Sequence, residues 1–129
     1  MSKDPKSIAL AYLAACARHD LDAVASLLAP DLEFVGVSRT VQGAQAYLDV
    51  LRRLAPIWKD SAVQRLFTDG NEVCAIYDFV TDTSAGAVPC VEWLRIEGER
   101  IRKVNLYFDR VRFQPAMDEL ARRAVRPTG

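Results

Sequence analysis

The stretch VPCVEWLRIEGERIRKVNLYFD, residues 88–109, decides the fold of this chain. Apolar and polar residues alternate through most of it, and β-branched and aromatic residues are frequent. The triplet Glu97-Gly98-Glu99 interrupts the alternation near its middle. This pattern predicts two long antiparallel strands that are joined by a tight turn.

Within this predicted hairpin, Glu92 is the residue that most needs an explanation. Strand alternation places it on the same face as Leu94 and Ile96, and it places Trp93 on the opposite face. A carboxylate on an apolar face costs free energy unless it has a hydrogen-bonding partner or points into a cavity. Glu92 is therefore the first candidate for a functional side chain.

The rest of the chain supplies helices that can cover one face of such a sheet. Helices are predicted over residues 5–18, 21–28, 44–54 and 115–124, and further strands over residues 32–37, 62–67 and 73–81. Pro5 can open the first helix, Asp20 can cap the second, and Pro56 ends the third. This order predicts one α+β domain over residues 1–129, in which a strongly curved, mostly antiparallel sheet wraps the N-terminal helices and leaves an internal pocket.

Composition argues against several classes of protein. The chain has 129 residues, of which half are hydrophobic, and its 17 basic and 17 acidic residues give a formal net charge of zero. A nucleic-acid-binding protein would carry a basic surplus, and the apolar runs are too short to cross a membrane. Cys16, Cys74 and Cys90 lie in apolar patterns and indicate reduced thiols in a cytoplasmic protein. A single histidine without paired cysteines predicts no metal site, and no other cofactor is expected.

Four segments carry a resemblance to a known family. They are YLAAC at 12–16, HDLDAVASLLAPD at 19–31, GAQAY at 43–47, and Gly98 followed by LYFD at 106–109. Together they resemble the nuclear-transport-factor-2-like superfamily, which includes ketosteroid isomerases, SnoaL-like polyketide cyclases and limonene epoxide hydrolases. The resemblance covers nearly the whole chain and implies a cone-shaped domain with an internal pocket. It implies little about activity, because this fold carries enzymes, binding proteins and scaffolds.

The resemblance to ketosteroid isomerases implies an oxyanion hole made of Tyr12 and Glu92. Such a pair functions when apolar surroundings keep the carboxyl group protonated, so that it can donate to a developing enolate oxygen. The same enzymes have a carboxylate base at the end of the first strand, where this chain has Gly36. The resemblance to limonene epoxide hydrolases also lacks a catalytic residue, because Leu106 stands where that family has an aspartate. Both departures count against these two reactions.

A mostly apolar pocket is expected inside the cone. The residues predicted to line it are Phe34, Tyr47, Leu51, Trp58, Tyr77, Phe79, Leu94, Leu106 and Phe108. A pocket of this composition suits a small hydrophobic molecule that carries a carbonyl group. Alternatively, Tyr12 and Tyr47 are core aromatics whose hydroxyl groups bond to the backbone.

Three functions follow from these observations. The favoured one is a pocket protein of the SnoaL-like type that binds an apolar, carbonyl-bearing molecule without catalysis. The first alternative is a cofactor-independent acid–base enzyme of the isomerase, cyclase or hydrolase type that uses Tyr12 and Glu92. The second is a dimeric protein-interaction domain. A homodimer is expected in any case, because Trp93, Val91 and Tyr107 would form an apolar patch on the outer face of the sheet.

Three further polar residues have structural interpretations. Asp109 is expected to anchor the end of the last strand to the following loop. His19 is expected to cap a helix end or to be solvated. Asp78, between Tyr77 and Phe79, is expected to point outward at a subunit interface.

Overall fold

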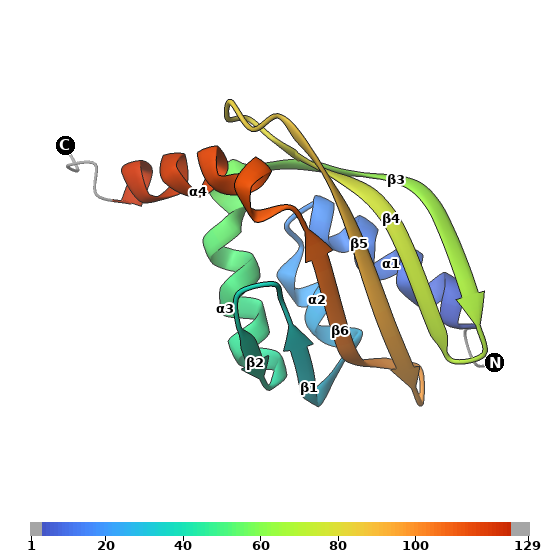
Figure 1. The fold of residues 1–129 in the computed structure, drawn as a ribbon. Coiled ribbons are helices and arrows are strands. Elements are labelled where there is room, and N and C mark those ends of the chain that lie inside the picture. Colours follow the sequence, from blue (N-terminus) through green and yellow to red (C-terminus); the bar gives the residue numbers. More distant parts are fainter. Residues whose placement is uncertain (1–3, 125–129) are drawn as a thin grey trace.

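The predicted hairpin forms the centre of a six-stranded sheet in a computed structural model that describes residues 4–124 (Figure 1). The helices are α1 (Pro5–Ala17), α2 (Leu21–Ser26), α3 (Ala44–Leu54) and α4 (Arg110–Ala124), and a short 3₁₀ helix, η1 (Ala55–Ile57), follows α3. The strands are β1 (Leu28–Val35), β2 (Thr40–Gln42), β3 (Trp58–Asp69), β4 (Glu72–Thr81), β5 (Ala87–Glu97) and β6 (Arg100–Phe108). The α+β class and the order of the main elements are thereby confirmed.

The strands lie side by side in the order β2-β1-β6-β5-β4-β3. Only β1 and β6 run parallel among these neighbouring pairs. The sheet curves strongly, and α1, α2 and α3 lie on one side of it, as Figure 1 shows. Helix α4 extends from the end of β6 across the upper end of α3 (Figure 1). None of the helices in residues 4–124 is long and apolar enough to cross a membrane.

Alternation explains which side chains of the hairpin form the core. Every second residue of β5 is buried, namely Val88, Cys90, Glu92, Leu94 and Ile96. Trp93 points to the outer face, where its side chain is 42% exposed. The turn to β6 consists of Gly98 and Glu99, and both have positive φ angles, of 57° and 68°. This is the geometry of a type I′ turn, which matches the twist of the two strands and favours glycine.

Two predicted boundaries at the start of the sheet are wrong. Helix α2 ends at Ser26 instead of Leu28, and β1 spans Leu28–Val35 instead of residues 32–37. The cause is tertiary pairing, because Leu28 lies opposite Ile101 of β6. Pro30 fits into this strand because the register shifts between Leu28 and Glu33, where no ladder hydrogen bond is needed from its nitrogen.

The start of the last helix was also mispredicted, since α4 begins at Arg110 and not at Pro115. Asp109 caps it: one carboxylate oxygen accepts hydrogen bonds from the backbone N–H groups of Val111 and Arg112, at 2.9 and 3.2 Å. Near the other end of the helix, Arg123 donates to the carbonyl oxygen of Pro56 at 2.7 Å. Helix α4 is thus attached to the rest of the domain near both of its ends.

Candidate functional site

A buried group of four side chains lies between the sheet and the helices. We call it the tyrosine–glutamate cluster, and it consists of Tyr12 from α1, Tyr47 from α3, Tyr77 from β4 and Glu92 from β5. The Tyr12 hydroxyl donates to Oε1 of Glu92 at 3.0 Å, and the Tyr77 hydroxyl donates to Oε2 at 2.5 Å. The hydroxyl groups of Tyr12 and Tyr47 are hydrogen-bonded to each other. The structure therefore brings Tyr12 and Glu92 together, as the sequence suggested.

Local structure explains why these four side chains meet. Glu92 lies opposite Ala75 in the β4–β5 ladder, so Tyr77 is its diagonal neighbour on the same face. Such diagonal pairs are within reach of long side chains. Tyr12 is almost completely buried on the inner side of α1, and Tyr47 is buried on α3. The small side chain of Ala75 leaves room beside the carboxyl group for the tyrosine rings.

The hydrogen-bond pattern of the cluster favours a negatively charged Glu92. Three hydrogen bonds connect the three hydroxyl groups and the two carboxyl oxygens. Tyr12 and Tyr77 each donate to the carboxylate, so Tyr47 must donate to Tyr12, and the three hydroxyl hydrogens fill all three bonds. A protonated Glu92 would add a fourth hydrogen, which would have no acceptor within the cluster.

Burial of Glu92 favours its neutral form instead, and it is the larger influence on the pKa of this group. It raises the pKa of Glu92 above the usual value, while the hydrogen bonds from Tyr77 and Tyr12 lower it. Burial also raises the pKa values of Tyr12, Tyr47 and Tyr77 well above the ordinary value, and the nearby charge of Glu92 adds to the effect. The three tyrosines therefore stay protonated at neutral pH, and Glu92 is the group of the cluster that can change its charge.

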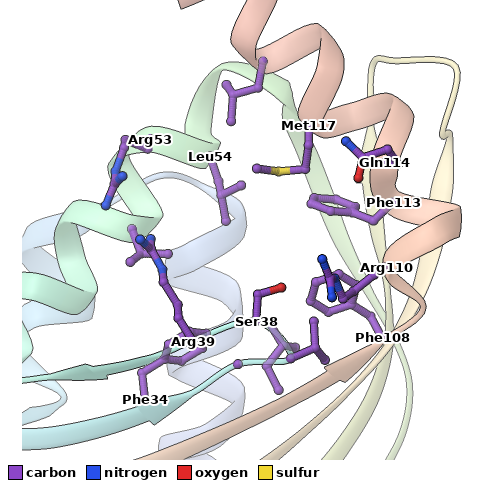
Figure 2. A pocket seen from close by; sticks show the side chains of 15 residues that line it. Phe34, Ser38, Arg39, Arg53, Leu54, Phe108, Arg110, Phe113, Gln114 and Met117 are labelled. Atoms are coloured by element: carbon purple, nitrogen blue, oxygen red, sulfur yellow. The ribbon is translucent and has the colours of Figure 1, made fainter.

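A pocket of about 420 Å³ lies beside this cluster, between α3, α4, the loop after β1 and the end of β6 (Figure 2). It is lined by Phe34, Gly36, Val37, Ser38, Arg39, Val50, Arg53, Leu54, Leu106, Phe108, Arg110, Phe113, Gln114, Met117 and Leu120. Most of these side chains are apolar, three are arginines, and none is acidic. Its volume and composition are those of small-molecule sites.

Phe34 separates the pocket from the cluster. Phe34 belongs to the pocket lining, and its ring stacks on Tyr47 with centroids 4.9 Å apart and an interplanar angle of 25°. None of the four cluster residues is part of the lining. The hydroxyl and carboxyl groups that the sequence places inside the pocket thus lie behind an aromatic wall.

The structure places only some of the predicted lining residues around this pocket. Phe34, Leu106 and Phe108 line it, whereas Tyr47, Leu51, Trp58, Tyr77, Phe79 and Leu94 are buried in the core and do not. Packing between aromatic rings accounts for part of this difference. The ring centroids of Trp58 and Phe79 are 4.5 Å apart, and Phe79 meets Phe113 of α4 at 5.6 Å. These rings fill the part of the cone that was expected to be hollow.

Gly36 is the position where the resemblance to ketosteroid isomerases implies a base, and a side chain would be crowded there. A Cβ atom added to Gly36 would lie 3.0 Å from Cε2 of Phe34 and 3.3 Å from the carbonyl oxygen of Arg39. The Phe34 ring also stacks on Tyr47. A side chain at position 36 would therefore require the Phe34 ring to shift.

The other polar residues considered in the sequence make hydrogen bonds that support the fold. Asp109 joins the last strand to the following segment, as expected, and does so by capping α4. The Nε2 atom of His19 lies 2.8 Å from the carbonyl oxygen of Trp58, so this ring fixes the start of β3. Asp78 faces outward and is contacted by Gln64 at 3.4 Å. Across residues 4–124, no three His, Cys, Asp or Glu side chains gather closely enough to hold a metal ion.

Sequence reasoning missed the contribution of α4 and of the arginines to the pocket. Phe113 and Met117 lie on α4, part of which was expected to be a loop. Arg53 and Arg110 were not predicted to line the pocket. A usable signal was present in Asp109, which is a good N-cap residue directly before an amphipathic segment.

Comparison with known proteins identifies the relatives of this chain. The sequence profile of the SnoaL-like domain matches residues 9–104. A protein from Kribbella flavida DSM 17836 has a similar structure, with a TM-score of 0.80 and 26% identity over 90% of this chain and 95% of that chain. An NTF2-like protein from Cytophaga hutchinsonii ATCC 33406 has a TM-score of 0.76 and 20% identity over 86% of this chain and 95% of that chain. TerC, co-crystallised with polyporic acid, has a TM-score of 0.77 and 16% identity over 88% of this chain and 98% of that chain.

A search among curated proteins finds no significant match. The domain profile nevertheless covers well over half of the chain, from α1 into β6. The structural neighbours share the curved sheet and the helices packed against it, which is the NTF2-like fold. This chain therefore belongs to the SnoaL-like domain family and has the NTF2-like fold.

Proposed function

We propose that this protein binds a small apolar molecule in the pocket between α3 and α4. The observation that carries this proposal is the contrast between the closed polar cluster and the mainly apolar pocket beside it. The tyrosine–glutamate cluster is closed, and no buried side-chain nitrogen or oxygen atom within the described residues lacks a hydrogen-bond partner. The pocket, in contrast, offers about 420 Å³ next to mainly apolar side chains. Burial of an apolar ligand there would release water from these side chains.

The structural neighbours are consistent with this proposal. The fold of this chain is shared with TerC, which has been co-crystallised with polyporic acid. At 16% identity this likeness concerns the fold, and the ligand belongs to that protein alone. It illustrates that this fold accommodates small organic molecules.

A fluorescence titration with N-phenyl-1-naphthylamine tests the proposal. We expect the probe to brighten on binding to the wild-type protein, and Met117→Trp to weaken its affinity by about tenfold because the larger side chain fills the pocket. Val111→Trp is the matched control, since Val111 lies on the same helix, is 83% exposed and does not line the pocket. Absence of binding to the wild type, or equal affinity for Met117→Trp, would contradict the proposal.

The second candidate function is an acid–base enzyme that uses Tyr12 and Glu92, and their hydrogen bond is the observation that favours it. A substrate would then have to pass Phe34 to reach these groups. We expect Tyr12→Phe to leave probe affinity within about twofold, because only apolar lining contacts hold the probe. If this substitution weakened the probe by tenfold while the variant stayed fully folded at the assay temperature, the cluster would have to contact the ligand, and the enzyme would become the better candidate.

We also propose a homodimer that forms through the outer face of the sheet. Phe67 and Trp93 flank Cys74 in one row of side chains, with exposed fractions of 52% and 42%, and Tyr107 in the next row is 50% exposed. Exposed apolar patches of this kind mark interaction sites. Light scattering at micromolar concentration should give about twice the chain mass if the dimer dissociation constant lies at about micromolar or below.

Trp93→Glu should shift this equilibrium toward the monomer, because it places charge in the centre of the patch. Val111→Glu, on α4 and away from the patch, is the control and should leave the mass unchanged. A wild-type protein that scatters as a monomer would refute the dimer.

A further inference from the structure

We infer that the ligand of this pocket is an amphipathic anion, namely a small apolar molecule with one carboxylate that the pocket arginines hold. This inference rests on the proposed function and names its ligand class. Arg39, Arg53 and Arg110 belong to the pocket lining, in which no acidic residue occurs. An uncharged ligand would offer no charged partner to these three arginines, whose side chains are exposed at the pocket.

The three arginines have no partner of their own in the part of the chain that the structure describes. The ion pairs and side-chain hydrogen bonds within residues 4–124 involve other basic residues, including Arg18, Arg102, Lys103 and Arg123. Since the whole chain has a formal net charge of zero, the positive charge at the pocket is a local excess. Charges of one sign around a low-dielectric cleft focus the field and attract the opposite charge.

Acidic residues close to the pocket in sequence are engaged elsewhere. Asp49 pairs with Arg52 at 2.6 Å, on the same helix as Arg53. Asp109, next to Arg110, caps the backbone of α4. Asp118 accepts a hydrogen bond from the amide group of Gln114 at 2.9 Å. None of these carboxylates therefore neutralises the pocket arginines.

The positions of the arginines suggest how such a ligand would lie. In Figure 2 the side chain of Arg39 extends from the loop after β1 toward α3, which carries Arg53, while Arg110, at the start of α4, lies on the other side of the view. Phe34, Leu54 and Phe113 contribute apolar surface between them. An aromatic or alicyclic body would rest on these side chains, and its carboxylate would face the guanidinium groups. Guanidinium groups match the two oxygens of a carboxylate with paired hydrogen bonds.

The test compares two competitors of nearly the same shape that differ in charge. Biphenyl-4-carboxylate and biphenyl-4-carboxamide are each titrated against the bound N-phenyl-1-naphthylamine. We expect the carboxylate to displace the probe at about tenfold lower concentration than the carboxamide, because a charged partner strengthens hydrogen bonds to guanidinium. This preference should shrink at high salt, since exposed charges are screened.

The triple variant Arg39→Gln, Arg53→Gln and Arg110→Gln should lose the preference for the carboxylate and keep its affinity for the carboxamide. Arg52→Gln is the control, because Arg52 neighbours Arg53 on α3 but does not line the pocket. The carboxamide also reports on folding, since a misfolded variant would lose both competitors. Singly substituted variants then replace the triple one.

The outcomes separate this inference from the proposal on which it rests. If the wild type does not bind the probe, the proposed pocket function fails. If the probe binds and both competitors displace it equally, or if the preference survives the loss of all three arginines, the anionic ligand is wrong and the binding pocket stands.

Discussion

Wild-type protein should lose stability relative to Glu92→Gln as the pH rises from acid toward neutral. The pKa of Glu92 is raised in the folded state above its ordinary value of 4.5, mainly by burial. Between the unfolded and the folded pKa, the folded protein therefore binds more protons than the unfolded chain. Stability that is fully present below the unfolded pKa is then lost as the pH rises through the folded pKa.

The magnitude has an upper limit set by one titrating group. The difference in unfolding free energy between the two proteins should change by at most about 1.4 kcal/mol per pH unit within this window. Urea unfolding at a series of pH values measures it. Using the difference removes the contributions of other carboxylates, such as Asp4, whose pKa is lowered in the folded state. Asp69→Asn, an exposed substitution at the end of β3, is the control. The expectation would be contradicted if the unfolding free energies of wild type and Glu92→Gln changed in parallel with pH.

Removing single hydroxyl groups from the cluster should destabilise the protein in a defined order. Tyr77→Phe takes away the donor at 2.5 Å from Oε2 of Glu92 and leaves this oxygen without a hydrogen bond. We expect a loss of roughly 1.5–3 kcal/mol at a pH where Glu92 is ionised, the range for hydrogen bonds to charged groups. Tyr47→Phe removes only a donor to Tyr12, which still donates to Glu92, so its cost should be about 1 kcal/mol.

Urea unfolding of both variants at neutral pH provides the measurement. Tyr107→Phe is the matched control, since Tyr107 is 50% exposed and lies on the outer face. Its effect should be close to zero. If Tyr47→Phe cost as much as Tyr77→Phe, the order in which the hydroxyl groups donate toward Glu92 would be wrong.

The central hairpin could be predicted from the sequence because the pattern that specifies it lies in neighbouring residues. Alternation between 88 and 109 is a property of neighbouring residues, and it correctly placed Glu92 inside and Trp93 outside. The start of β1 could not be predicted in this way. Leu28 continues the apolar pattern of the preceding helix, and only its pairing with Ile101 of β6 makes it part of a strand.

The candidate site shows the same division. Tyr12 and Glu92 meet as expected, because a tyrosine on the inner side of α1 and an inward carboxylate on β5 face the same interior. Tyr77 was expected to line the pocket and not to bind Glu92. The position of the pocket depends on how α4 lies against α3, which no pattern within either helix specifies. Arginines on such a rim have the same sequence pattern as solvated ones, so their role appears only when the elements are assembled.

Phe34 gives the fold a simple route for functional change. Its ring lies between the pocket, which it helps to line, and Tyr47 of the tyrosine–glutamate cluster. The two are adjacent, and a shorter side chain at position 34 would join them. A carboxyl group that now serves the architecture would then face whatever molecule occupies the pocket. The size of the side chain at position 34 would thus decide whether the carboxyl group of Glu92 borders the pocket.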